Sequence, residues 1–95
     1  MRISIIQQQS ILRTMHQNFG PATKVWLFGS RVDDARRGGD VDLYVETNQV
    51  NTFLTTLRCK IVLEECLDLP VDLIVKDQRK EDPIYQIAKR EGVQL

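Results

Sequence analysis

The strongest constraint on the fold is a helix-length segment that separates two short apolar strands. Val41–Val45 and Val71–Val75 have the alternating pattern of strands, and segment 50–67 between them has apolar residues at helical spacing. About 18 residues make a helix of roughly 27 Å, which is the crossover that two parallel strands require. We therefore expect the two strands to be parallel and to begin at the same edge of one sheet.

Two more helices are expected near the ends of the chain. Ser4–Gln7 fits a capping box, so the first helix should begin at Ile5 and end at Gly20–Pro21. A last helix should open at Asp82–Pro83, with the aspartate as its cap, and end at Gly92. The apolar stripe predicted for the first helix consists of Ile5, Gln8, Leu12, Met15 and Phe19.

A further strand is predicted at Lys24–Phe28, a β-branched and aromatic run that stops at Gly29–Ser30. The ten-residue connection 30–39 is too short for a full helical crossover, so this strand and the next should run antiparallel. The predicted fold class is α/β (α+β), a small mixed sheet of about three strands flanked by helices in the order α-β-β-α-β-α. Residues 1–95 should form a single domain, because so short a chain cannot build a second core.

The long helix 50–67 is predicted to have a wide apolar face that includes both cysteines. Cys59 and Cys66 are separated by about 10 Å along a helix, which is too far for a disulfide, and we expect both thiols to be buried and reduced. Because His16 is the only histidine, a structural zinc site is excluded. The predicted apolar face comprises Val50, Phe53, Leu54, Leu57, Cys59, Ile61, Val62, Leu63 and Cys66.

The composition limits the classes of partner. Thirteen Lys and Arg against thirteen Asp and Glu give no net charge, so no overall field draws the chain to nucleic acid or to an anionic membrane. The hydrophobic content of 42% suits a globular core rather than a disordered segment. No apolar run approaches the roughly 18 residues of a membrane span, so we expect a cytoplasmic protein without a membrane partner.

Three aspartates occupy the starts of the two parallel strands. Asp40 and Asp42 are separated by one residue, so both should project to the same face, and Asp72 has the matching position in its own strand. Any one of them alone is equally consistent with a turn residue. Three carboxylates at one edge raise each other's pKa unless a cation is present, and such oxygen ligands suit Mg²⁺ or Mn²⁺. The sequence therefore predicts a metal site.

The turn Gly29–Ser30 should lie at the same edge of the sheet, because the antiparallel strand before it ends there. Its backbone amides and hydroxyl group follow a strand directly and are suited to bind a phosphate. Alone, this dipeptide is also an ordinary turn. Its position beside an acid pair makes a nucleotide site the more specific interpretation.

The combination of these motifs is similar to a known signature. Phe28-Gly29-Ser30, followed after nine residues by Asp40-Val41-Asp42-Leu43, resembles the signature of the DNA polymerase beta-like nucleotidyltransferase superfamily. Within that superfamily, the small size and the run Trp26-Leu27-Phe28-Gly29-Ser30-Arg31 resemble the minimal nucleotidyltransferases, many of which act as antitoxins beside a small helical HEPN toxin. The resemblance covers Lys24 to Val75 well and the flanking helices loosely.

The resemblance implies roles for individual residues. Asp40 and Asp42 would hold two metal ions, and Asp72 would ligate the catalytic ion and help to deprotonate the acceptor. Gly29 and Ser30 would hold the β- and γ-phosphates of ATP. Two cations about 3.5–4 Å apart activate an attacking hydroxyl and neutralise the leaving pyrophosphate, so no protein nucleophile is needed.

The connection between the motifs departs from the family pattern. Residues 32–34, Val-Asp-Asp, replace the usual small residue, arginine and glycine, and Gly39 stands where a serine often precedes the first aspartate. We expect the two acids to face solvent, because they would repel a triphosphate. Arg31, Arg36 and Arg37 are expected near the phosphates or a partner, with a solvated loop as the alternative for the latter two.

The function that the resemblance implies is Mg²⁺-dependent transfer of AMP from ATP to a hydroxyl group of a partner. A tyrosine of a paired HEPN toxin is the favoured acceptor, and the partner would complete the cleft. One alternative is an antitoxin that blocks its toxin sterically and retains the aspartates without using them. Another is transfer to an RNA 3′ end, which zero net charge and the lack of an RNA-binding domain disfavour.

Overall fold

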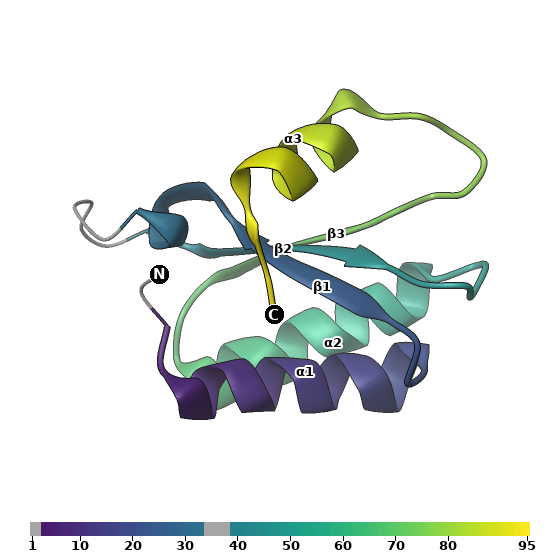
Figure 1. The fold of residues 1–95 in the computed structure, drawn as a ribbon. Helices are drawn as coiled ribbons and strands as arrows, with labels where there is room; N and C mark the ends of the chain where they lie inside the picture. Colours follow the sequence, from purple (N-terminus) through teal and green to yellow (C-terminus); the bar gives the residue numbers. More distant parts are fainter. Residues whose placement is uncertain (1–2, 34–38) are drawn as a thin grey trace.

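In the computed structural model, a four-stranded sheet is covered by helices on both faces (Figure 1). The structure describes residues 3–33 and 39–95, and within these ranges no helix is long and apolar enough to cross a membrane. The elements in chain order are α1 (Ile5–Phe19), β1 (Lys24–Phe28), the 3₁₀ helix η1 (Gly29–Val32), β2 (Val41–Glu46), α2 (Phe53–Leu67), β3 (Val71–Val75), α3 (Pro83–Glu91) and β4 (Val93–Gln94).

The sheet has the strand order β3-β2-β1-β4. β2 and β3 are parallel and are connected by α2, while β1 and β2 are antiparallel, and both expectations are confirmed. The prediction of about three strands missed β4, in which Gln94 and Val93 pair with Trp26 and Leu27 of β1. Two residues are too few to show the alternation that indicates a strand.

Each face of the sheet has its own apolar layer, because the side chains of a strand alternate between faces. α1 and α2 cover one face, and α3 crosses part of the other (Figure 1). The α1 and α2 layer includes the fully buried Leu27, Leu43 and Leu63. The α3 layer is smaller and is formed by Trp26, Tyr44, Tyr85 and Ala88.

Helix α1 begins and ends where the sequence predicts, and Met15 and Phe19 of the predicted stripe are buried, but the first turn of the helix is not. The Ser4 hydroxyl accepts from the Gln7 amide and the Gln7 side chain accepts from the Ser4 amide, which confirms the capping box. Ile5, predicted to belong to the apolar stripe, is 74% exposed, whereas Ile11 is fully buried. Since α1 packs against α2 as well as over the sheet, its buried face includes Ile11 and Thr14 rather than the first turn.

Helix α2 corrects two further predictions. It begins at Phe53 rather than Val50, because Asn51 has a positive φ of 56° that interrupts a helix. Its buried residues are Cys59, Leu63 and Leu67. The rest of the predicted face is not buried, because one side of α2 faces away from the domain. Cys66 is exposed, and so are Phe53, Leu54, Leu57 and Ile61.

Candidate active site

The ends of three strands bring the predicted site residues together. In the parallel pair of β2 and β3, Asp42 is the direct partner of Asp72. In the antiparallel pair of β1 and β2, Phe28 is the partner of Asp42, so Gly29 begins at the same edge. Asp40 precedes β2 by one residue. We refer to Asp40, Asp42 and Asp72 as the acidic rim.

The electrostatics of the acidic rim act mainly on Asp42. Burial and the negative charges of Asp72 and Asp40 raise the pKa of Asp42 to about 6, and a hydrogen bond with the Asp72 side chain adds to the shift. Asp42 is half-buried, whereas Asp40 and Asp72 are exposed. A protein that keeps three carboxylates so close stores repulsion that a bound cation would relieve.

The donor chemistry of the acidic rim fits a hard divalent cation, because all of its donors are carboxylate oxygens. Among the described residues, no group of three or more His, Cys, Asp or Glu side chains is already arranged to hold an ion. Asp42 and Asp72 are direct partners in the strand pair, so they are the first two ligands to which a metal site would add others. When bound there, Mg²⁺ would supply charge neutralisation for a phosphate group.

Gly29 is required at its position for two reasons. Its φ of 77° lies in the left-handed region, which side chains other than glycine disfavour. A Cβ atom at this position would also collide with the Asp42 carboxylate. The sequence predicts that this turn binds a phosphate, and the structure adds an internal reason for glycine at this position. Gly29 leaves room for the Asp42 side chain at the edge of the sheet.

The residues after Gly29 close the connection between β1 and β2. The Arg31 guanidinium donates from Nε and Nη2 to the Gly39 carbonyl oxygen, at 3.3 and 3.2 Å, and so ties the connection together. Gly39 has a φ of 91°, and a Cβ atom there would collide with the Ser30 hydroxyl. Arg31 thus has a structural contact besides its expected role near phosphates. Asp33 is exposed, as expected. Asp34, Arg36 and Arg37 lie outside the described residues.

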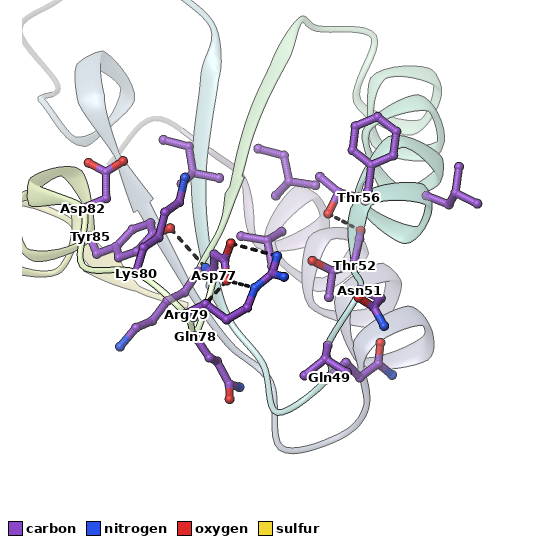
Figure 2. A pocket seen from close by; sticks show the side chains of 17 residues that line it. Gln49, Asn51, Thr52, Thr56, Asp77, Gln78, Arg79, Lys80, Asp82 and Tyr85 are labelled. Atoms are coloured by element: carbon purple, nitrogen blue, oxygen red, sulfur yellow. Dashed lines mark hydrogen bonds and ion pairs between the residues drawn. The ribbon is translucent and has the colours of Figure 1, made fainter.

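A cavity of about 650 Å³ lies beside β3, nearer to the end of the strand that is opposite the acidic rim (Figure 2). Its walls come from the residues before and in the first turn of α2, from β3, and from the 76–82 loop. Arg79 and Lys80 belong to this loop, so they lie beyond the far end of β3. Sequence reasoning missed this cavity, because its walls come from segments that show no shared pattern.

The mixed sheet and its acidic rim define a nucleotidyltransferase fold, and sequence comparison gives the family. The family model described as polymerase beta, nucleotidyltransferase matches residues 9–95. The chain therefore belongs to the polymerase beta nucleotidyltransferase family. No curated protein matches the sequence at a significant level.

Among the solved structures that share this fold are a provisionally assigned minimal nucleotidyltransferase and an MNT antitoxin. A protein provisionally assigned as one is 26% identical, with a TM-score of 0.73 over 95% of this chain and 90% of that chain. A complex of a tri-AMPylated Shewanella oneidensis HEPN toxin with MNT antitoxin is 21% identical, with a TM-score of 0.70 over 94% and 68%. The MntA-HepT toxin-antitoxin structure is 19% identical, with a TM-score of 0.71 over 96% and 70%.

The raised pKa of Asp42 predicts how stability depends on pH. Because its pKa is about 6 in the folded chain and near 3.8 when unfolded, the folded state holds a proton more tightly between these values. Without divalent cations, the free energy of unfolding should therefore fall as pH rises from about 4 to 7. Asp42→Asn should reduce this fall and be more stable than the parent at pH 7.

Urea denaturation at pH 4 and pH 7 measures this effect, and added Mg²⁺ should narrow the difference between the two proteins at pH 7. Glu65→Gln, which neutralises an exposed acid of α2, is the matched control and should behave as the parent does. If the stability of Asp42→Asn has the same pH dependence as that of the parent, the other two carboxylates of the acidic rim do not repel Asp42.

Proposed function

We propose that the chain is an adenylyltransferase that moves AMP from ATP to a hydroxyl group of a HEPN-type toxin, and so acts as its antitoxin in the cytoplasm. The observation that carries this proposal is the pairing of Asp42 with Asp72 next to the Gly29 turn. Membership of a nucleotidyltransferase family supports the reaction class. The similarity to antitoxins solved with HEPN toxins supports the kind of partner.

Each side of the site has a proposed task. Asp40 and Asp42 would hold two Mg²⁺ ions, or Mn²⁺ in their place, and these ions would neutralise the charge on the phosphates. Gly29 and Ser30 would bind the β- and γ-phosphates, with Arg31 and Arg37 close to them. In the free chain the Asp42 carboxylate lies directly against Gly29, because the glycine leaves space for it.

The proposed step is an in-line displacement at the α-phosphorus of ATP. The acceptor oxygen forms a new bond to the α-phosphorus while the bond from that phosphorus to the bridging oxygen breaks, and pyrophosphate leaves. The acceptor proton passes to the Asp72 carboxylate, which lies beside Asp42 at the edge of the sheet. Asp72 is exposed, so a hydroxyl group on another protein has access to it.

Asp72→Asn should separate transfer from partner binding. Asparagine retains the size of the side chain but loses both the charge and the ability to accept a proton. We expect AMP transfer to a co-expressed HEPN protein of the same genome to fall by at least about 10²-fold, while its affinity changes less than about twofold. Transfer is measured with ATP labelled at the α-phosphate, and affinity by calorimetry.

Glu65→Gln is again the control, because it removes an exposed carboxylate from α2 without touching the acidic rim. It should transfer AMP at the parental rate. If Asp72→Asn transfers AMP at the full rate, Asp72 does not accept the proton, and solvent or a group of the partner accepts it instead.

A further inference from the structure

β3 forms an outer edge of the sheet, and part of that edge is open. In the order β3-β2-β1-β4 it pairs only with β2 among the described residues. Its bonds to β2 include the Pro70 carbonyl and the Lys76 amide at the two ends of the strand. Alternate residues of a strand bond to opposite sides, so the backbone groups of Val71, Leu73 and Val75 point away from β2.

Helix α2 satisfies the first of these outward-facing residues. The Lys60 ammonium donates to the Val71 carbonyl, and the Val71 amide donates to the Glu64 carboxylate at 2.9 Å. Within residues 3–33 and 39–95, no corresponding partner exists for the outward amides and carbonyls of Leu73 and Val75. Unpaired groups at the edge of a sheet are a template for another extended strand.

The open part of the edge faces the 650 Å³ cavity, which we call the β3 groove. Leu73 and Val75 belong to its lining. On the α2 side it is lined by Phe53 and Leu54, whose side chains are 73% and 70% exposed. Strand addition gives affinity through the backbone, and pockets for alternate side chains give specificity. The β3 groove offers both features in one place.

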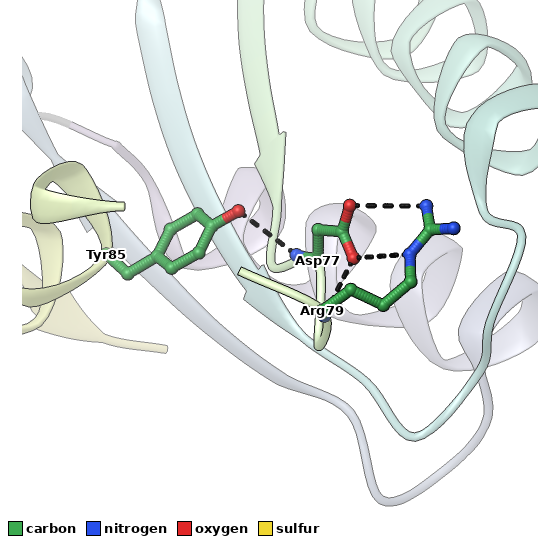
Figure 3. A network of polar contacts seen from close by, with 3 residues as sticks. All are labelled: Asp77, Arg79 and Tyr85. Atoms are coloured by element: carbon green, nitrogen blue, oxygen red, sulfur yellow. Dashed lines mark hydrogen bonds and ion pairs between the residues drawn. The ribbon is translucent and has the colours of Figure 1, made fainter. Parts of the chain in front are cut away.

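The opposite wall of the β3 groove is held in position by hydrogen bonds (Figure 3). The Tyr85 hydroxyl accepts from the Asp77 amide at 3.1 Å, and the Asp77 carboxylate accepts from the Arg79 amide and guanidinium. Tyr85 itself is buried and stacks on Tyr44 of β2. The 76–82 loop is therefore fixed to the sheet through α3, and the groove exists before any partner binds.

The charges of the lining favour an acidic occupant. Lys76, Arg79 and Lys80 line the groove against Asp77 and Asp82. Arg79 pairs with Asp77, and Asp82 accepts from the Ile84 amide as the cap of α3. Lys80 also lies close enough to Asp77, and Lys76 to Glu46, for their charges to interact. The lining as a whole has three cations against two carboxylates, and this excess of one positive charge favours an acidic side chain of an occupant.

We propose that an extended, acidic segment of the protein partner adds to β3 as a fifth strand, with an apolar side chain in the β3 groove. This inference rests on the proposed function, and it states how the partner would place its acceptor hydroxyl group at the site. On an added strand, the residue opposite Asp72 has its Cβ about 4.5–5.5 Å from the Asp72 Cβ. Docking at Leu73 and Val75 therefore brings a partner side chain beside the carboxylate proposed to take the acceptor proton.

Hydrogen exchange of the ¹⁵N-labelled chain, alone and with the co-expressed HEPN protein, tests the backbone pairing. The Leu73 and Val75 amides should exchange rapidly in the free chain and at least about tenfold more slowly in the complex. The amides of Asp72 and Ile74, which face β2, should be protected in both states. Unchanged exchange at Leu73 and Val75 in the complex, or failure of any complex to form, overturns the proposal.

A pair of matched variants tests the groove. Leu54→Lys and Ile61→Lys each place a cation at an exposed apolar position of α2, but only Leu54 lines the β3 groove. Affinity for the HEPN protein should fall at least about tenfold with Leu54→Lys and less than about twofold with Ile61→Lys. Equal losses would place the partner on the outer face of α2 and contradict the proposal.

These measurements separate the docking proposal from the proposed function, because neither exchange nor affinity requires transfer. Slow exchange at Leu73 and Val75 without any AMP transfer would retain the docking site and reject the enzyme. AMP transfer together with fast exchange at these amides would retain the enzyme and reject the docking site. Sedimentation of the chain alone adds a third outcome, since pairing with a second copy through β3 would cover Asp72 and overturn the proposal.

Discussion

Replacing Asp40 and Asp42 together by asparagine should reduce AMP transfer by at least about 10³-fold. In the proposed site these two carboxylates hold both Mg²⁺ ions, so the double variant loses the charge that offsets the triphosphate and the developing charge of the transition state. Binding of Mg·ATP to the chain should weaken as well, because the Mg²⁺ that accompanies the nucleotide would lose two carboxylate ligands.

Calorimetry with Mg·ATP and transfer of label from the α-phosphate measure the two effects separately. The double variant should remain folded and gain stability without metal, because it removes the repulsion that raises the pKa of Asp42. A loss of activity together with a loss of folding would thus point to a structural role. Parental Mg·ATP binding by the double variant would show that the nucleotide binds elsewhere.

Gly29→Val should be the most damaging single substitution at the turn. A β-branched residue at a φ of 77° costs at least about 1–2 kcal/mol, and its Cβ collides in addition with the Asp42 carboxylate. We expect the free energy of unfolding to fall by more than about 2 kcal/mol and transfer to become undetectable. Displacement of Asp42 from its place beside Asp72 is the cause of the second effect.

Gly20→Val is the matched control for backbone strain. Gly20 also has a positive φ, of 105°, but a Cβ atom there meets nothing within 4 Å. Its cost in stability is therefore strain alone, and transfer should be retained. The two variants are compared by their transfer activity rather than by their stability, because Gly20, with a ψ of 160°, lies in a region that only glycine adopts readily and its strain differs from that at Gly29. If Gly29→Val and Gly20→Val retain the same AMP transfer, the Asp42 side chain can move aside without affecting the site.

The core of the fold could be predicted because its signals are local. The alternation in Val41–Val45 and Val71–Val75 and the helical spacing between them imply a parallel pair. That topology alone places Asp42 beside Asp72. The capping box at Ser4 and the Asp82 cap located the ends of helices for the same reason, since a cap involves residues close in sequence.

The features that could not be predicted depend on contacts between segments that are distant in sequence. Periodicity showed that α2 has apolar positions, but not that several of them, including Leu57 and Ile61, are exposed. No spacing in the sequence indicates the contact of Arg31 with Gly39. The β3 groove likewise depends on hydrogen bonds between distant segments, such as the one from the Asp77 amide to the Tyr85 hydroxyl of α3.

The intact mass of the HEPN protein after incubation with the chain, ATP and Mg²⁺ shows directly whether the chain transfers AMP to it. We expect its mass to increase by one or more AMP groups, with one pyrophosphate released for each, and we expect no increase with Asp72→Asn. If the chain forms a complex and neutralises the toxin while the mass of the toxin stays unchanged, the chain is a steric antitoxin and the proposed adenylyltransferase activity is contradicted.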